Sequence, residues 1–386
     1  MDVLIILLCI FYLLRVFVIR FASGRLRKKY KKNINYKELP FISVIIPARN
    51  EENNIENCIN SVLNSNYPTE LFEIIVVNDR SDDATLTIVE KIAAIHNTKI
   101  KICNILTQTA NPNLKGKPGA IKIGIDNAAG ELLLMTDADC IVNKNWIYTT
   151  VQHFIDAKEE NIGMICSYTN VISNNLFHYF QAAEWYYMHT FACAGIGLNT
   201  ILGCFGNNIA ITKTAYNKIG GYESLKFSVT EDYILLKAIS DAGFSIRYLC
   251  LEDTIVETLP VNSFKEYMLQ RKRWAVGGMN LGIKAFLYVA SSIALWIAII
   301  MSAITGNWYL LIISCLLRFL GDCVILFPIF DTLKTKYLKK WIPLSVCFYC
   351  VIEILLVFMI TNRKVYWKGQ IFNEKSKKTI YDFSTP

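Results

Sequence analysis

The chain has 386 residues, of which 53% are hydrophobic, and its formal net charge is +8. This length allows one large or two ordinary domains. The hydrophobic fraction is high for a purely soluble protein. The excess positive charge lies in clusters beside apolar segments, which is typical of contact with lipid head groups. Basic residues do not form a stripe interleaved with aromatic ones, so we expect no nucleic-acid partner.

The first apolar segment, Val3–Phe21, is long enough to cross a bilayer. Only Asp2 and no basic residue precedes it, and no cleavage site follows a short apolar core, so it is not a typical cleaved signal. Seven basic residues lie in the last part of it or soon after it: Arg20, Arg25, Arg27, Lys28, Lys29, Lys31 and Lys32. By the positive-inside rule, a transmembrane helix over 1–22 and a basic linker over 23–40 place the following domain in the cytoplasm.

Residues 41–140 alternate strands and helices. The pattern predicts strands at Phe41–Pro47 and Glu73–Val77, each followed by a helix, at Glu52–Asn64 and Ala84–Ile95. This order indicates βαβ units and a parallel sheet. A loop at 115–119, a helix over 120–129 and a strand at 132–136 complete a nucleotide-binding type of α/β half.

Asp137-Ala-Asp139 comes directly after the last of these strands. In open α/β sheets, ligands bind at the carboxyl ends of the strands. Two carboxylates suit a hard divalent cation that also binds a substrate's phosphates. An acidic turn after a strand is the alternative reading of the same three residues.

The half over 141–283 is less regular. A helix predicted at Leu176–Ala194 is rich in Tyr and Trp, which favours an amphipathic helix at the membrane interface over a core helix. Thr230 is expected to cap a helix over 233–242 whose first turn carries Glu231 and Asp232. A further helix over 263–282 carries Gln270-Arg-Lys-Arg-Trp274.

Three more apolar segments, at 285–304, 308–330 and 341–361, predict two to three transmembrane helices within residues 284–361. Arg318 and Asp322 lie four residues apart and are expected to pair. The loop with Lys334, Lys336, Lys339 and Lys340 and the basic tail over 362–386 both favour the cytoplasm. They cannot both lie there if every segment crosses, so one of the three is expected to be re-entrant or interfacial.

Several motifs occur in the order found in the membrane-anchored family-2 glycosyltransferases of GT-A fold, and the chain resembles this family over 41–282. The fold is therefore expected to be α/β, a Rossmann-like, mostly parallel sheet, joined to transmembrane helices. The matching motifs are Val44-Ile-Ile-Pro-Ala-Arg-Asn-Glu51, Val76-Val-Asn-Asp-Arg-Ser-Asp-Asp83, Asp137-Ala-Asp139, Gly206-Asn-Asn-Ile-Ala210, Gly220-Gly-Tyr222, Thr230-Glu-Asp232 and Gln270-Arg-Lys-Arg-Trp274.

The resemblance implies a role for each matching residue. Asp139 and Asp137 would hold Mg²⁺ or Mn²⁺, with Asp137 also near the ribose, and Arg273 would contact the diphosphate. Asp232 would be the catalytic base, next to Glu231, and Trp274 with Gln270 would support the acceptor. The residues expected around the donor nucleotide are Ala48, Glu51, Asp79 and Lys117. Lys122 departs from the family pattern.

The implied function is inverting transfer of a sugar from a nucleotide donor, UDP-linked, to a lipid or glycan. The implied location is the cytoplasmic face of a bacterial-type inner (plasma) membrane, so membrane lipids are expected partners. Two alternatives stay open. One is a processive polysaccharide synthase, and the other is a catalytically silent membrane scaffold that binds nucleotide-sugars.

Overall fold

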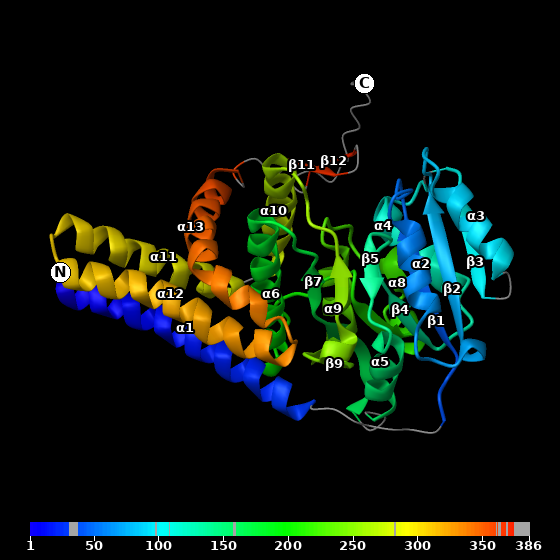
Figure 1. Cartoon of the computed structure of the whole chain (residues 1–386), viewed down its shortest axis with the longest axis horizontal. Helices are drawn as coiled ribbons and strands as arrows, with labels where there is room; N and C mark the ends of the chain where they lie inside the picture. The colour runs from blue at the N-terminus through cyan, green and yellow to red at the C-terminus, as the bar shows by residue number, and fades with distance from the viewer. Residues whose placement is uncertain are drawn as a thin grey trace.

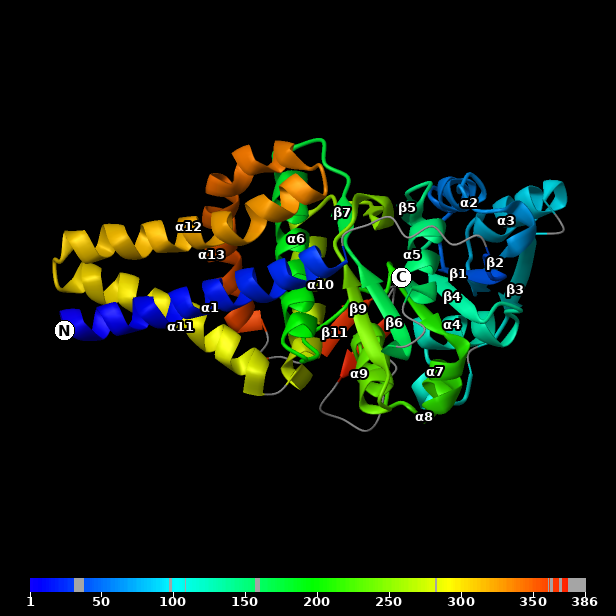
Figure 2. The ribbon, with the colours of Figure 1, turned by 90° about the horizontal axis from the view of Figure 1, so that it is seen from below.

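A computed structural model describes residues 1–30, 38–96, 99–107, 109–156, 160–281, 283–359, 361, 364–367 and 370–373. Figure 1 shows three parts in sequence along its long axis: a bundle that contains the N-terminus, a layer of upright helices, and a mixed α/β region. Figure 2 shows the same order from below. The α/β region contains the elements between residues 42 and 258 except the helix Leu176–Gly197, which belongs to the layer of upright helices.

A seven-stranded sheet forms the centre of the α/β region, with the strand order β3-β2-β1-β4-β8-β6-β9. The pairs among β1, β2, β3 and β4 are parallel, as is β6 with β9, whereas β8 runs antiparallel to both of its neighbours. The strands are β1 (Ile42–Ala48), β2 (Phe72–Asp79), β3 (Ile100–Ile105), β4 (Leu132–Met135), β6 (Ile162–Ser167), β8 (Ile209–Thr212) and β9 (Ser245–Leu249).

The strand register brings three ligand-type segments to one edge of the sheet. Ile45 of β1 is aligned with Ile75 of β2 and with Met135 of β4. Because these strands are parallel, the residues that follow them all lie at the carboxyl edge. The apolar β1 and β2 are buried on both faces, as parallel strands covered by helices usually are.

Helices and short strands surround this sheet. The helices are α2 (Ile55–Leu63), α3 (Thr85–Ile95), α4 (Lys117–Asp126), α5 (Trp146–Ile155), α7 (Lys213–Lys218), α8 (Gly221–Ser224) and α9 (Glu231–Asp241). A second sheet has the order β5-β10-β7 and consists of β5 (Cys140–Val142), β7 (Thr169–Val171) and β10 (Val256–Thr258).

The aromatic helix α6 (Leu176–Gly197) packs against protein along its length. Trp185 and Tyr186 are buried, and the helix contacts α1, α12 and α13. The buried rings of this helix are therefore held by other helices of the protein, and its position at the membrane interface stays a prediction. Beside it stands α10 (Phe264–Gly278), which the short helix η5 (Met279–Leu281) connects to the next element.

Four helices of the described residues are long and apolar enough to cross a membrane. They are α1 (Asp2–Lys29), α11 (Ile283–Ile304), α12 (Trp308–Thr332) and α13 (Ile342–Met359), with the helix η6 (Lys336–Trp341) before the last. The helix α1 continues seven residues beyond the predicted boundary at residue 22. Residues 31–37 of the expected linker lie outside the described residues.

Arg318 and Asp322 face each other on α12, as predicted from their spacing, with 4.0 Å between their nearest charged atoms. A closer partner of Arg318 is Glu353 of α13, at 2.8 Å. The expected basic tail contains the strands β11 (Lys364–Trp367) and β12 (Gln370–Asn373), and its last residues, 374–386, lie outside the described part of the chain.

Candidate active site

A cavity of about 770 Å³ opens at the carboxyl edge of the sheet, between the α/β region and the helices α6 and α10. All eleven residues predicted for the site contribute to its wall, although they come from segments up to 226 residues apart. The lining includes Ala48, Glu51, Asp79, Lys117, Asp137, Asp139, Glu231, Asp232, Gln270, Arg273 and Trp274.

Glu51 and Asp79 lie where β1 and β2 end, and local hydrogen bonds fix both. The Asn54 side chain donates to Oε2 of Glu51 at 2.8 Å, and the amide of Glu51 donates to the hydroxyl of Thr85 at 2.7 Å. The guanidinium of Arg80 pairs with Asp79 at 2.7 Å. This side of the cavity therefore offers preorganised acceptors for a ligand with hydroxyl and amide donors.

The Asp137–Asp139 turn is held from both sides by thiols. Cys58 donates to the carbonyl of Asp137 at 3.3 Å, and Cys140 donates to the carboxylate of Asp139 at 3.4 Å. In the described ranges, no three His, Cys, Asp or Glu side chains are grouped closely enough to enclose a metal ion. Two carboxylates still fit Mg²⁺ or Mn²⁺, because such ions in nucleotide sites take further oxygens from phosphates and water.

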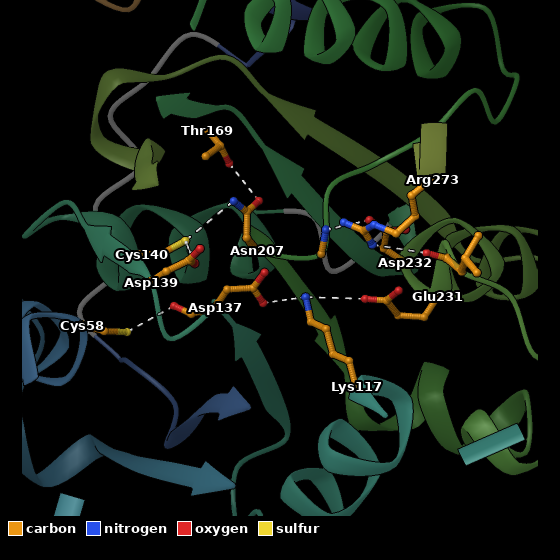
Figure 3. A network of polar contacts seen from close by, with 12 residues as sticks. Cys58, Lys117, Asp137, Asp139, Cys140, Thr169, Asn207, Glu231, Asp232 and Arg273 are labelled. Carbon is orange, nitrogen blue, oxygen red and sulfur yellow. Dashed lines mark hydrogen bonds and ion pairs between the residues drawn. The ribbon is translucent and has the colours of Figure 1, made fainter. Parts of the chain in front are cut away.

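The sequence predicts a loop over residues 115–119, but this prediction is wrong for Lys117, which begins the helix α4. Pro118 lies in the first turn of this helix, a position where proline is tolerated. The Lys117 ammonium lies 2.5 Å from Oδ1 of Asp137 and 3.5 Å from Oε1 of Glu231, and its side chain is only 14% exposed. Figure 3 shows it between these two carboxylates.

The charge of Lys117 is secured by this position. Burial alone lowers the pKa of the ammonium, but the carboxylates of Asp137 and Glu231 outweigh burial and raise the pKa above its ordinary value. A permanent positive charge therefore lies midway between the turn after β4 and the start of α9.

Asp232 sits in the first turn of α9 and accepts two main-chain hydrogen bonds. The amide of Gly206 donates to Oδ2 at 2.9 Å, and the amide of Tyr233 donates to Oδ1 at 2.8 Å. The loop with Gly206 is itself anchored, since Thr169 donates to the side chain of Asn207 at 3.1 Å. Thr230 occupies the N-cap position as predicted, but its side chain makes no capping hydrogen bond.

The pKa of Asp232 is raised from 3.8 to about 7. Burial is the main cause and the neighbouring Glu231 carboxylate adds to it, while Lys117 and the two amide donors act in the opposite direction. A carboxylate with a pKa near neutrality is suited to accept and release protons at physiological pH.

The helix α10 fits tightly against the start of α9. A Cβ atom on Gly277 would come within 2.3 Å of the Thr230 side chain, so only glycine allows this approach. One turn earlier on α10, the Arg273 guanidinium donates to the carbonyl of Val229 at 3.4 Å. Arg273 and Asp232 are thus positioned by the same contact between two helices.

Trp274 belongs to an aromatic cluster inside the protein. Its ring packs edge-to-face against Trp185 and Phe205, with centroids 5.2 and 6.0 Å away. The guanidinium of Arg271 lies 4.2 Å from the ring centroid. The arrangement leaves Trp274 on the cavity wall, packed among aromatic rings of the protein.

Glu184 is a residue of this region that the sequence reasoning missed. Its carboxylate pairs with Arg271 at 2.6 Å and accepts a hydrogen bond from the Tyr267 hydroxyl at 2.7 Å. A signal existed, since Glu184 is the sole charged residue of the helix α6. Buried single charges call for a partner of opposite sign, but the sequence does not say which one.

The parallel sheet with its antiparallel strand β8, the acidic turn after β4 and the cavity beside them define a glycosyltransferase of the GT-A class. A family model described as "Glycosyltransferase like family 2" matches residues 40–277, more than half of the chain. The chain belongs to this family.

Two curated relatives illustrate the range of the family. The probable glycosyltransferase YdaM of Bacillus subtilis is 30% identical over 256 residues, which cover 65% of this chain and 58% of the relative. The beta-monoglucosyldiacylglycerol synthase of a Nostoc species is 27% identical over 259 residues, or 65% of this chain and 51% of the relative. The match thus spans a little over half the length of these relatives.

A solved structure shares the fold. The mannosyltransferase PcManGT of Pyrobaculum calidifontis, in complex with GDP-Man and Mn²⁺, superposes with a TM-score of 0.58 at 16% identity and covers 90% of this chain and 99% of that one. The predicted fold, a GT-A sheet joined to apolar helices, is therefore confirmed. The roles of the individual residues stay predictions.

Proposed function

We propose that this protein is a metal-dependent, inverting glycosyltransferase. It moves a sugar from a UDP-linked donor to a lipid or glycan acceptor at the cytoplasmic face of a bacterial-type inner (plasma) membrane. One observation carries the proposal. Asp232, a carboxylate with a pKa of about 7, shares a single cavity with Asp137, Asp139 and Arg273. A proton acceptor and a set of diphosphate-binding groups are the two parts that such a transfer needs.

The donor end of the cavity binds the leaving group. Ala48, Glu51 and Asp79 contact the nucleoside, and Arg273 grips the diphosphate, because a guanidinium matches phosphate oxygens in a fork. Asp139, with Asp137, holds Mg²⁺ or Mn²⁺, which when bound offsets the negative charge of the departing diphosphate. Lys117 keeps its charge at all physiological pH values and adds to this stabilisation.

The acceptor end supplies the base. Asp232 takes the proton of the acceptor hydroxyl as that oxygen attacks the anomeric carbon, while the amides of Gly206 and Tyr233 hold the carboxylate in place. The carboxylate attacks nothing itself, so the transfer is one displacement from the face opposite the leaving group. Such a displacement inverts the anomeric configuration.

The acceptor rests on Trp274 and Gln270. The cavity wall beyond them is apolar and includes Met188, Phe191 and Leu202, next to the point where the chain enters α11. A wall of this kind supports an acceptor presented at a membrane. The Nostoc relative is named a beta-monoglucosyldiacylglycerol synthase, which is in line with such an acceptor.

The test is an assay of membranes that contain the full chain with labelled nucleotide-sugars, with Mn²⁺ or with a chelator, followed by lipid extraction. We expect label in the organic phase that depends on the cation. Label in an aqueous polymer would replace single transfer by processive synthesis. Nucleotide binding without any transfer would leave the scaffold alternative.

A matched variant tests the base. Asp232→Asn keeps the size of the side chain but cannot accept the proton, and its single oxygen can accept only one of the two main-chain hydrogen bonds. We expect turnover to fall by about 10²–10⁴-fold while the Kd for UDP, measured by calorimetry, stays within a factor of about two to three of the wild type. Normal turnover in this variant would refute the assignment of Asp232.

A further inference from the structure

We infer that α13 does not cross the membrane. It lies beside α6 and α10, in the leaflet on the catalytic side. Three helices then span the bilayer instead of four. Hydropathy and length alone would allow α13 to span, since Glu353, which pairs with Arg318 of α12, is the one charged side chain among its 18 residues.

The chain touches the catalytic region immediately before α13. The Lys334 ammonium pairs with Glu252, in the segment between β9 and β10, at 2.7 Å. Trp341, the last residue of η6, stacks on Tyr179 of α6 with ring centroids 4.9 Å apart. The amino end of α13 is therefore on the catalytic side.

The carboxyl end of α13 is on the same side. Ile352 and Met359 pack in a cluster with Tyr267 and Met268 of α10. Beyond the helix, Val365 of β11 is 1% exposed and packs against Val229, which lines the active-site cavity. A spanning helix of this length would place its two ends about 27 Å apart on opposite faces of the bilayer, which these contacts exclude.

The helix α6 does not itself cross the membrane, so contacts with α6 place a segment on the catalytic side. It starts after β7 and its chain returns to β8, and both strands belong to the α/β region. It also lines the active-site cavity together with α10. In Figure 1, α13 stands upright beside α6 and α10, whereas α1, α11 and α12 extend together away from the α/β region.

Three crossings remove the conflict in the distribution of charge. The helix α1 ends on the catalytic side, where Lys29 pairs with Glu160 at 3.2 Å, and α11 starts there after α10. Only the residues before α1 and the turn at 305–307, which has no Lys or Arg, then lie on the far side. The basic residues at 334–340 and Lys364, the basic residue of the tail in the described part of the chain, lie on the catalytic side, in agreement with the positive-inside rule.

The outer face of α13 has the chemistry of a lipid-binding surface. Ile342, Val346, Tyr349 and Ile352 are buried against the protein. On the opposite face Leu344, Val351 and Phe358 are 49, 55 and 71% exposed. This face continues the exposed apolar surface of α11 and α12, so its partner is the acyl-chain region of one leaflet and not a second protein.

Two epitope-tag insertions test the number of crossings. One tag follows Gly306, where added atoms would meet nothing within 4 Å, and the other is appended to Pro386. In intact spheroplasts we expect antibody to bind the first tag, and to bind the second only after permeabilisation. Binding to both tags in intact spheroplasts would show that α13 crosses, and binding to neither would overturn the three-helix arrangement.

A depth measurement tests the position of α13 without relying on topology. A fluorescent amino acid replaces Leu344, Val351 or Phe358, which follow one another at steps of about 10 Å along the helix. At each position we compare quenching by lipids brominated near the head group with quenching by lipids brominated near the chain end. We expect the ratio of the two to be the same at all three positions. A spanning helix would instead show strongest deep quenching at the middle position. The same probe at Ser345, which is fully buried, is the control and should be quenched by neither lipid.

Discussion

The ammonium of Lys117 lies 2.5 Å from the carboxylate of Asp137, at the point where the donor and acceptor ends of the cavity meet. The same ammonium lies 3.5 Å from Glu231, the neighbour of Asp232. One positive charge therefore influences both the phosphate-binding turn after β4 and the proton acceptor on α9. A change at Lys117 should be felt at both ends.

The pH dependence of the reaction should report this coupling. Asp232 acts as a base only when ionised, so kcat/KM should fall about tenfold per pH unit below its pKa of about 7. Lys117 lowers that pKa, so Lys117→Met should move the acid limb of the profile to higher pH. Lys122→Met is the control, because Lys122 pairs with Asp126 and Glu223 instead. A limb that does not move would argue against the coupling.

The stability of the fold should also depend on Asp232. Its pKa is higher in the folded state than the ordinary value of 3.8, so the folded protein binds more protons, and stability is lost as the pH rises through about 7. Asp232→Asn should therefore raise the unfolding temperature more at pH 8 than at pH 5. The corresponding gain in the free energy of unfolding should be larger at pH 8 by on the order of 2–4 kcal/mol. Thermal unfolding in detergent at both pH values measures this, and an equal effect at both would contradict it.

Two adjacent glycines of α10 provide a matched pair of variants. A Cβ on Gly277 would clash with Thr230 at 2.3 Å, whereas a Cβ on Gly278 would meet only Leu281, at 3.7 Å. We expect Gly277→Ala to cost about 1–3 kcal/mol of stability and to reduce kcat by moving α10, and with it Arg273, relative to the start of α9. Gly278→Ala should leave both quantities within about 0.5 kcal/mol of the wild type. Equal behaviour of the two variants would show that the contact of α10 with α9 is not critical.

The ion pair of Glu184 with Arg271 should support the Trp274 platform. Glu184→Gln leaves the buried guanidinium of Arg271 without its counter-charge, which we expect to cost about 3–5 kcal/mol. Replacing both residues, as Glu184→Gln with Arg271→Met, should recover part of that loss, because no unpaired charge remains. Denaturant unfolding of the two single variants and the double variant gives the coupling energy. A coupling of zero would mean that the pair has no structural role.

The sequence predicts the first half of the fold well because its strands carry a strong local signal. β1, β2 and β4 are continuous apolar runs, each ended by polar residues, and their order indicates a parallel sheet. The edge strand β3 was not predicted, since its residues are mostly half-buried or exposed and give no clear pattern. Strands such as β7 and β10 have three residues each, too few for any periodicity.

The sequence places the site residues by motif but not by contact. The eleven predicted site residues all line one cavity, yet the motifs give no sign that Lys117 links Asp137 to Glu231. The partner of Glu184 is 87 residues away, a separation at which residue spacing carries no information. The orientation inferred for α13 is equally hidden, because an apolar helix has the same composition whether it crosses the bilayer or lies in one leaflet.

The two hydrogen bonds to Asp232 come from main-chain amides, and this has a consequence for variation in the family. No exchange of side chain at Tyr233 other than to proline can delete its amide, so an alanine scan would register Asp232 and overlook the groups that orient it. Residues that face the acceptor can change freely while the proton acceptor keeps its geometry. One scaffold can in this way acquire new acceptors without rebuilding its chemistry.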